Sequence, residues 1–538
     1  MADEHDDGTY LGIDLSTQQM KCVILDANAT VIHRECVKFD DFGTENGVLI
    51  GGDDGRTATS PVRMWLRSLD RLMSRLVDSR RDLLVRLRAV SGGAQQHGTV
   101  YWRRGNSLRT LNADASLEDQ LKNAFTIENS PIWMDSSTQA ECEALERLVG
   151  GDQRLCELSG SRAHHRFSAA QIMKIVDRHP QAWNDTDRVS LISSFVASLL
   201  IGDYAPIDYT DGSGTNLMDV RANVWLKELV DSISPDLERK LGPLADPTIP
   251  LGTVGDYFQQ RYGIPRECLV LPFVGDNPAS LAGLCLQPTD IGVSLGTSDT
   301  VFFATRSFRP CVDAHVFAHF DTNAHAFMPL VTSPKNASPI RNRRRFSFKN
   351  GSLTRERARH LANSSSWREF DAILDATPPG NSGRVGLFFD GDEIAPRVSR
   401  GDYFIDEARP TTVAELCRTV LESQCYLKRF YTSLMMSDDV ERVVVTGGAS
   451  VNVALLQMLA DVFNCNVYTI DVEDSAALGA AMRARYATSN SSVAFNTFYS
   501  SRSRSHMKHS ASPNAVNHAK HAATFETFKT LLQQISFN

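Results

Sequence analysis

The sequence lacks several patterns that would assign it to a class at once. Its ten cysteines stand singly, with no C-x-x-C pair, so we expect reduced thiols rather than a zinc or redox site. His315 and His319 stand four apart in a strand-like run, where a structural role is expected rather than a metal pair. No apolar run is long enough to cross a bilayer, and the first residues are acidic where a secretory signal would be basic. We therefore expect a cytoplasmic protein without a membrane partner.

The chain also lacks an excess of positive charge. It has 56 Lys and Arg residues against 64 Asp and Glu residues, a formal net charge of −8. Because positive charge supplies most of the affinity for nucleic acids, this balance argues against a nucleic-acid partner. The 538 residues, 42% of them hydrophobic, are typical of a globular protein with two large domains.

The two commonest glycine-rich nucleotide signatures, G-x-x-x-x-G-K-[ST] and G-x-G-x-x-G, are absent. Two similar turns are present instead, one in each half of the chain. Residues 11–19 read LGIDLSTQQ, and residues 291–299 read IGVSLGTSD. In both, an apolar strand precedes a turn of Gly, Ser and Thr, and a second apolar strand follows, as in a hairpin.

A second motif repeats in the same order, because residues 90–94 read VSGGA and residues 445–449 read VTGGA. Ordered repetition predicts a duplicated architecture. Strand-like runs at 268–274, 443–445 and 466–470 alternate with helical patterns at 452–463 and 475–486, which predicts α/β layers. We expect two duplicated α/β domains around a central cleft.

The predicted domains have these bounds. The first spans residues 9–284 and the second spans residues 285–490. The polar, basic segment 332–347 interrupts the second, and we expect it to be a solvated surface insertion rather than a nuclear-import or phosphate-binding segment. Residues 491–538 form a Ser- and His-rich tail, expected to be a linker that leads to a docking helix over 522–535.

The two turns suggest how phosphates are held. Small residues let backbone N–H groups approach phosphate oxygens, and hydroxyls add hydrogen bonds, so two facing turns would clamp a triphosphate. Asp14 lies in the first turn, where the second turn has Ser294. A carboxylate would repel phosphates unless a divalent cation lay between them, which predicts Mg²⁺ near Asp14. The alternative is that Asp14 only stabilises the turn.

Asp276 follows the strand-like run that ends at Val274. Asn277 and Pro278 suit the Ncap and N1 positions of a helix. An aspartate at a strand end can accept the proton of a sugar hydroxyl that attacks a γ-phosphate, although helix capping also explains these residues.

Other polar residues are candidates for ligand contacts, each with a structural alternative. His97 could donate a hydrogen bond to a sugar hydroxyl or pack in its turn. The run Trp133, Met134 and Asp135, and also Arg166, are further candidates for sugar contacts. Gly447 and Gly448 would let the backbone approach an adenosine, or form a plain tight turn.

Taken together, these residues resemble the FGGY family of carbohydrate kinases, whose members share the ribonuclease-H-like fold of actin and hexokinase. The resemblance spans about residues 10–485 and is strongest to eukaryotic members that act on D-xylulose. It rests on the motifs at residues 14–19 (DLSTQQ), 95–98 (QQHG), 133–138 (WMDSST), 211–214 (DGSG), 275–280 (GDNPAS), 294–299 (SLGTSD), 348–352 (FKNGS) and 446–450 (TGGAS).

The resemblance implies ATP-dependent, Mg²⁺-assisted phosphorylation of D-xylulose to D-xylulose 5-phosphate, with ADP as the second product, by a monomer or homodimer. It implies that Asp276 is the catalytic base. The implied sugar contacts are His97, Arg166, Asp276 and Asn277; the nucleotide contacts are Thr17, Thr297, Trp367, Gly447, Gly448, Ala449 and Asn452; and the metal residue is Asp14. Many bacterial relatives have an arginine where Ser137 stands, so contacts at that position are not carried over.

Two alternatives stay open. The motifs do not specify sugar stereochemistry, so a kinase for another ketose or polyol, such as ribulose or glycerol, also fits. Actin-like and chaperone ATPases share the duplicated phosphate turns, but Asp276 beside a second, sugar-sized site favours a kinase.

Overall fold

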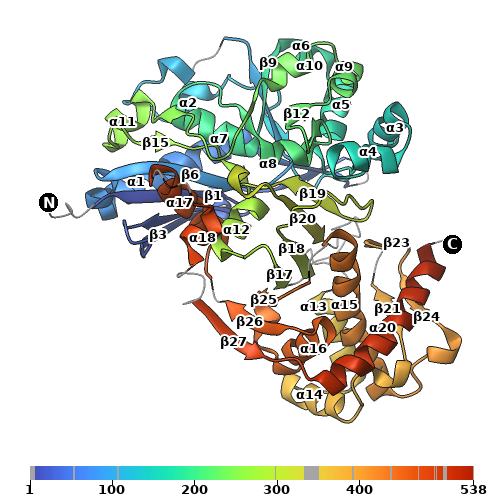
Figure 1. Cartoon of the computed structure of the whole chain (residues 1–538). Helices are drawn as coiled ribbons and strands as arrows, with labels where there is room; N and C mark the ends of the chain where they lie inside the picture. The colour runs from blue at the N-terminus through green and yellow to red at the C-terminus, as the bar shows by residue number, and fades with distance from the viewer. Residues whose placement is uncertain are drawn as a thin grey trace.

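Two seven-stranded sheets, one in each half of the chain, form the two lobes of the molecule (Figure 1). The computed structural model describes residues 7–52, 55–105, 108–296, 299–332, 351–390, 393–436, 439–470, 472–489, 491, 493–500 and 506–536. Apart from its first residue, the predicted insertion at 332–347 lies outside the described residues.

The first sheet has the order β14-β15-β6-β1-β2-β3, and β16 also pairs with β6. Its strands are β1 (Thr9–Leu15), β2 (Gln19–Leu25), β3 (Val31–Lys38), β6 (Leu87–Ala94), β14 (Gly252–Thr253), β15 (Leu269–Val270) and β16 (Val274–Gly275). Strands β1, β2 and β3 form an antiparallel meander, whereas β6 runs parallel to β1 and β15 runs parallel to β6.

The second sheet has the order β19-β20-β18-β17-β25-β26-β27. Its strands are β17 (Asp290–Leu295), β18 (Asp299–Phe303), β19 (His315–Ala318), β20 (Phe327–Thr332), β25 (Arg442–Thr446), β26 (Asn466–Ile470) and β27 (Met507–Ala511). The run β20-β18-β17-β25-β26 repeats the order and the strand directions of β3-β2-β1-β6-β15. The predicted duplicated α/β fold is confirmed.

Smaller elements surround the two sheets. In the first half they are β4 (Leu49–Gly51), β5 (Thr57–Pro61), α1 (Val62–Leu84), β7 (Thr99–Arg103), α2 (Leu117–Leu121), β8 (Asn129–Pro131), α3 (Gln139–Val149), α4 (Asp152–Ser159), α5 (Ser168–Arg178), α6 (Pro180–Asp185), β9 (Thr186–Leu191), α7 (Ile192–Ile201), β10 (Ile207–Asp208), α8 (Tyr209–Gly212), β11 (Met218–Asp219), β12 (Val224–Trp225), α9 (Lys227–Ile233), α10 (Leu237–Leu241), β13 (Leu244–Ala245) and α11 (Asp256–Tyr262). In the second half they are α13 (Ser352–Leu361), α14 (Trp367–Asp375), β21 (Gly386–Phe389), β22 (Glu393–Ile394), β23 (Arg397–Val398), β24 (Gly401–Phe404), α15 (Val413–Met435), α16 (Val453–Phe463), α18 (Phe495–Phe498) and α20 (Ala515–Ser536).

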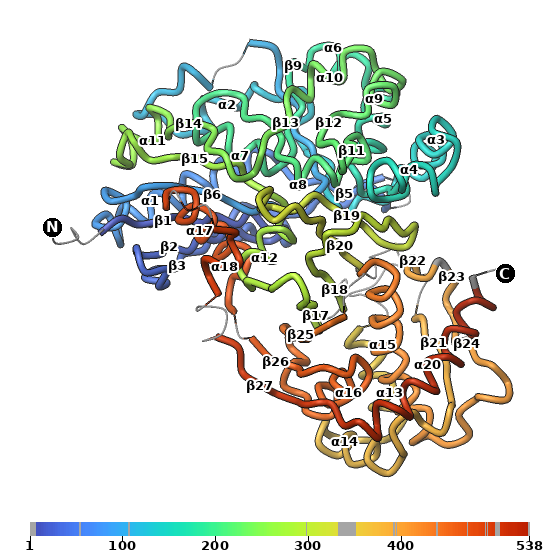
Figure 2. The backbone as a smooth tube through the Cα atoms, viewed as in Figure 1, coloured from blue at the N-terminus to red at the C-terminus, as the bar shows by residue number. Residues whose placement is uncertain are grey.

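Helices α12 (Asp276–Leu284) and α17 (Ser475–Thr488) pack tightly against each other beside the first sheet (Figure 2). A Cβ atom at Gly479 would stand 1.9 Å from the carbonyl oxygen of Ala279, and one at Gly12 would stand 2.0 Å from that of Ala477. Only glycine permits this approach. Helix α17 therefore belongs by packing to the first sheet, although it lies within residues 285–490, the range expected for the second domain.

Two expectations about local structure are wrong. The strand predicted over 268–274 is broken into β15 and β16, with Pro272 between them; its carbonyl accepts a hydrogen bond from Arg483 at 3.2 Å, and proline has no N–H for a sheet ladder. The tail is not a plain linker, because β27 extends the second sheet. The helix of the tail begins at Ala515 rather than at residue 522. The Asn514 side chain caps this start, because it accepts hydrogen bonds from the backbone N–H groups of Val516 and Asn517.

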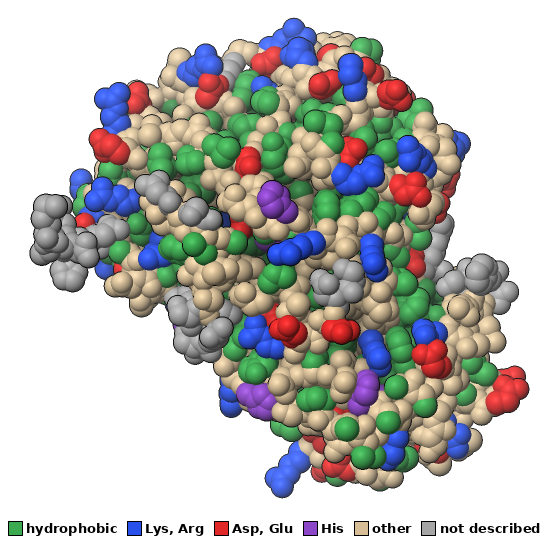
Figure 3. Space-filling model, viewed as in Figure 1, with side chains coloured by type: hydrophobic (Ala, Val, Ile, Leu, Met, Phe, Trp, Pro, Cys, Tyr) green, Lys and Arg blue, Asp and Glu red, His purple; other side chains and the backbone are tan. Residues whose placement is uncertain are grey.

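The surface carries charges of both signs. Basic and acidic side chains are interspersed over the face shown in Figure 3. None of the helices in the described ranges is both long and apolar enough to span a membrane. All ten cysteines are free thiols, and eight of them are buried.

Candidate active site

A polar cavity of about 200 Å³ lies where the two lobes meet. It is lined by Gln96, His97, Trp133, Arg166, Asp276, Asn277, Thr300, His315 and Leu330. All four predicted sugar contacts are in this lining. Three of its residues, Thr300, His315 and Leu330, come from the second lobe, so the cavity is closed by both halves of the chain.

Asp276 is the first residue of α12, directly after β16, which pairs with β6. The expectation that Asn277 is the N-cap is wrong: Gly275 has the extended N-cap conformation, and Asn277 and Pro278 lie inside the first turn, where proline's missing N–H costs nothing. One Asp276 oxygen, Oδ1, accepts hydrogen bonds from the backbone N of Asn277 at 2.9 Å and from its Nδ2 at 3.1 Å. The same amide donates to Gln96 Oε1 at 2.9 Å. These hydrogen bonds hold the Asp276 carboxylate in place at the cavity wall.

Burial, followed by the negative charge of Asp14, raises the pKa of Asp276 to about 7. A carboxylate with a pKa near the working pH is well suited to accept a proton in catalysis. The two aspartates are close because β6 lies between β1 and β16 in the sheet, with Gly93 paired to Asp14 on one side and to Val274 on the other.

Asp14 is the penultimate residue of β1, the first strand of the hairpin, and is buried. Its Oδ2 accepts a hydrogen bond from Ser16 Oγ at 2.5 Å, whereas its Oδ1 is buried without a hydrogen-bond partner. Burial raises the pKa of Asp14 to about 6. A divalent cation would supply the missing partner for Oδ1 and stabilise the ionised form, so this carboxylate fits the Mg²⁺ role. Nearby, Thr17 Oγ1 accepts a hydrogen bond from Trp133 Nε1 at 2.9 Å, which links the first turn to the cavity wall.

His97 adopts a left-handed backbone conformation, with φ of 73°. Its Nδ1 lies 2.8 Å from the carbonyl oxygen of Gly214, so Nδ1 carries the proton. Burial lowers the pKa of His97 to about 3, so the ring is neutral and Nε2 is a hydrogen-bond acceptor. In this tautomer Nε2 can only accept a hydrogen bond, whereas the sequence analysis expected His97 to donate one to a sugar hydroxyl.

Arg166 is buried beside the cavity, and its Nη2 lies 2.7 Å from Nε2 of His315. Burial lowers the pKa of Arg166 to about 10, which leaves it charged at neutral pH. Phe167 stacks on the His97 ring at a centroid distance of 4.3 Å and also contacts His315 at 5.0 Å. Sequence analysis expected His315 to be purely structural, yet it lines the cavity.

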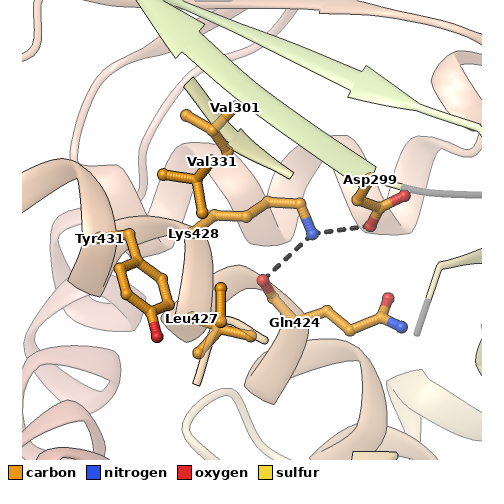
Figure 4. Close-up of a pocket in the computed structure, with 8 residues that line it drawn as sticks. Asp299, Val301, Val331, Gln424, Leu427, Lys428 and Tyr431 are labelled. Carbon is orange, nitrogen blue, oxygen red and sulfur yellow. Dashed lines mark hydrogen bonds and ion pairs between the residues drawn. The ribbon is translucent and has the colours of Figure 1, made fainter. Parts of the chain in front are cut away.

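The second turn is held by a buried charge cluster, which we call the Asp299 clamp: Asp299, Arg355 and Lys428. Predicted residue Thr297 lies outside the described residues. The Asp299 carboxylate accepts Arg355 Nη1 at 2.7 Å and Nη2 at 3.0 Å, and Lys428 Nζ at 2.7 Å (Figure 4). Arg355 also donates to the carbonyl of Gly296 at 3.4 Å. The clamp therefore anchors both sides of the turn to α13 and α15.

The predicted adenosine contacts lie at the carboxyl end of β25. Gly447 has φ of 93°, and a Cβ there would stand 2.6 Å from the Leu295 carbonyl oxygen, so glycine is required. A 3₁₀ turn over Gly448–Val451 contains Ala449 and leads to Asn452, the N-cap of α16. Asn452 Nδ2 donates to Asp371 Oδ1 at 3.2 Å. Trp367 begins α14, one helical turn before Asp371, and so lies on the same face of that helix as Asp371.

Not every candidate near the cavity has a role in it. Asp135 is fully buried and accepts hydrogen bonds from Ala58 N and Gln171 Nε2, so it is structural. Sequence analysis did not single out Gln96 or Thr300 as contacts. The sequence could have pointed to both, because Gln96 precedes His97 within one motif and Thr300 directly follows the second Gly/Ser/Thr turn.

Comparisons with known proteins agree with this arrangement. The N-terminal domain model of the FGGY family of carbohydrate kinases matches residues 9–283, and its C-terminal domain model matches residues 291–488. The chain is 40% identical to mouse xylulose kinase, with 98% of this chain and 94% of the mouse protein covered, and 39% identical to xylulose kinase 2 of Arabidopsis thaliana, with 89% and 87% covered. A crystal structure of xylulose kinase from Rhodospirillum rubrum superposes with a TM-score of 0.78 at 15% identity, covering 98% of each chain.

Proposed function

The chain belongs to the FGGY family of carbohydrate kinases, and we propose that it transfers the γ-phosphoryl group of ATP to the terminal hydroxyl of D-xylulose. D-xylulose 5-phosphate and ADP are the products. Relatives that are 39–40% identical to the chain, from mouse, rat and Arabidopsis thaliana, are xylulose kinases, which supports this sugar over ribulose or glycerol.

One observation carries the proposal. Asp276, whose pKa is raised to about 7, lines the same small cavity as His97, Arg166 and Asn277. A base, a hydrogen-bond acceptor, a charged donor and an amide thus face one space that both lobes line. An ATPase without a sugar substrate has no need of such a second, hydroxyl-binding cavity.

The chemistry proposed for this cavity is in-line displacement. The ketose lies with its terminal hydroxyl against the Asp276 carboxylate, which accepts the proton as that oxygen forms a bond to the γ-phosphorus. The bond from the γ-phosphorus to the bridging oxygen breaks, and ADP leaves. His97 Nε2 accepts a hydrogen bond from another sugar hydroxyl, and the Arg166 guanidinium donates to a sugar oxygen.

The nucleotide is proposed to lie between the two hairpin turns. Thr17 and its backbone neighbours are proposed to contact the phosphates, a role that the resemblance also implies for Thr297. The proposed adenosine contacts are Gly447, Gly448, Ala449, Asn452 and Trp367. Asp14 would hold Mg²⁺ through its free oxygen. When bound, Mg²⁺ neutralises phosphate charge.

A substitution of the base tests the assignment. Asp276→Asn keeps the shape and removes the proton acceptor, so kcat should fall by roughly 10²–10⁴-fold, the usual worth of a positioned general base, while ATP affinity is retained. Asp256→Asn is a matched control, because Asp256 also begins a helix, α11, away from the cavity. Near-normal turnover in Asp276→Asn would refute the role. Sugar-independent ADP release by the wild-type protein would instead indicate an ATPase.

We also propose that the protein acts in the cytoplasm, as a monomer or homodimer. Its ten free thiols support a reducing compartment.

A further inference from the structure

A histidine from the second lobe contacts an arginine of the first lobe in the proposed ketose cavity, where the two lobes meet. His315 begins β19 at the edge of the second sheet, and Arg166 precedes α5 in the first half of the chain. Their side chains are both buried, and Arg166 Nη2 lies 2.7 Å from His315 Nε2. The two lobes are therefore joined by a hydrogen bond inside the cavity itself.

The partners of His315 determine its protonation. A guanidinium has only donors, so Nε2 of His315 must accept the hydrogen bond. The proton then lies on Nδ1, which donates to Ser161 Oγ at 3.1 Å. Burial, and next the charge of Arg166, lower the pKa of His315 well below its ordinary value. His315 is a neutral acceptor with both ring nitrogens engaged.

Arg166 keeps its charge uncompensated in this cavity. Within the described part of the chain, no carboxylate pairs with Arg166, and its Nε has no hydrogen-bond partner. Buried cations are usually paired with a carboxylate, which would occupy the guanidinium fork and cancel the charge. The neutral imidazole of His315 instead accepts one N–H of Arg166 and leaves the guanidinium charge available to the oxygen atoms of a sugar.

We propose that His315 is a positioning residue for the ketose: from the second lobe, it anchors the Arg166 guanidinium without neutralising it. The inference rests on the proposed function and adds a determinant of ketose affinity. Because the anchor comes from the other lobe, ketose affinity depends on how the lobes meet. ATP affinity should not depend on it, because β20, β18 and β17 separate β19, which carries His315, from β25, which leads to the predicted adenosine contacts.

Two variants of equal shape separate the anchoring from the charge. In His315→Gln, the side-chain oxygen can accept from Arg166 and remains neutral, so KM for D-xylulose should stay within about threefold of wild type. In His315→Glu, an equally placed oxygen carries a negative charge that pairs with Arg166. KM for D-xylulose should then rise roughly tenfold to hundredfold, the worth of a hydrogen bond to a charged group, with KM for ATP unchanged.

His319→Gln is the matched control. His319 lies four residues further on, is equally buried, and has its Nδ1 3.2 Å from the Asp321 carbonyl oxygen, but it does not line the cavity. Its substitution should leave KM for D-xylulose unchanged. His315→Leu, which removes the acceptor without adding charge, should raise KM about tenfold and provides the test if the glutamate variant does not fold.

Steady-state kinetics with each substrate varied, together with the melting temperature of each variant, decide the matter. Selective loss of ketose affinity in His315→Glu and His315→Leu, with His315→Gln near wild type, supports the inference. Equal KM values for D-xylulose in all four variants would overturn it while leaving the proposed function intact. A wild-type protein without sugar-dependent ADP release would refute the proposed function, and this inference with it.

Discussion

In the Asp299 clamp two buried cations share one carboxylate, so loss of the carboxylate should destabilise the protein more than loss of one cation. The exposed fractions are 2% for Arg355, 9% for Lys428 and 9% for Asp299. Asp299→Asn leaves both cations buried without an anion among the described residues. Loss of one partner of a buried pair costs about 3–5 kcal/mol of the free energy of unfolding.

Lys428→Met perturbs the same clamp much less. The bidentate pair between Arg355 and Asp299 stays neutral overall, and the methionine side chain lies against Val301, Val331 and Leu427 (Figure 4). We expect a loss of only about 1 kcal/mol, as for volume-conserving replacements. The two variants should therefore differ by at least about 2 kcal/mol.

Urea denaturation followed by circular dichroism measures this difference, and KM for ATP reports on the turn. Burial by itself would raise the pKa of Asp299, but the charges and hydrogen bonds of Lys428 and Arg355 together outweigh it, so the pKa is lowered. The stabilisation from its ionised form is therefore present above the ordinary aspartate pKa of about 4 and lost as pH falls through the lower folded value. Asp299→Asn should thus have a lower free energy of unfolding than wild type at pH 7, and the difference should shrink as the pH becomes acidic. It should also bind ATP less tightly. If the two variants lost the same free energy of unfolding at pH 7, the argument that Asp299 compensates two buried cations would be refuted.

Three further predictions follow from separate features. Because the pKa of Asp276 is raised to about 7, kcat/KM for the ketose should rise with pH through about 7, and a flat profile from pH 5 to 9 would contradict its role as base. Gly479→Ala forces a Cβ to 1.9 Å from the Ala279 carbonyl oxygen and should lower the melting temperature by several degrees, whereas Gly51→Ala, in open space, should not; equal melting temperatures would argue against the tight helix packing. Trp367→Ala should raise KM for ATP about tenfold or more without affecting KM for the ketose, as loss of base stacking would, and an unchanged KM for ATP would remove Trp367 from the adenosine site.

Short sequence motifs predicted the parts of the site that are built from residues adjacent in the chain. Asp14 lies near the end of one strand and Asp276 directly follows another, so their place at the carboxyl ends of the strands could be expected from the repeat of turns and strands. His97, Arg166 and Asp276 were candidates from the residues themselves and Asn277 came from the family resemblance, and one cavity brings the four together. The duplicated order of strands was likewise visible in the ordered repeat of the Gly-rich motifs.

Other features depend on contacts between distant segments and left no local signal. His315 contacts Arg166 across 149 positions, and a single histidine in a strand does not indicate what lies opposite. Helix α17 follows strands of the second sheet yet packs on the first, and chain order alone cannot show this. Strand β27 was missed because an edge strand of polar residues resembles a loop in sequence.

Identification of the phosphorylated product tests the central claim most directly. Wild-type protein is incubated with Mg-ATP and D-xylulose, and phosphorus NMR follows where the γ-phosphoryl group goes. The account predicts a phosphate monoester on the terminal carbon of the sugar, formed in equal amount to ADP. Release of inorganic phosphate with the sugar unchanged would contradict it.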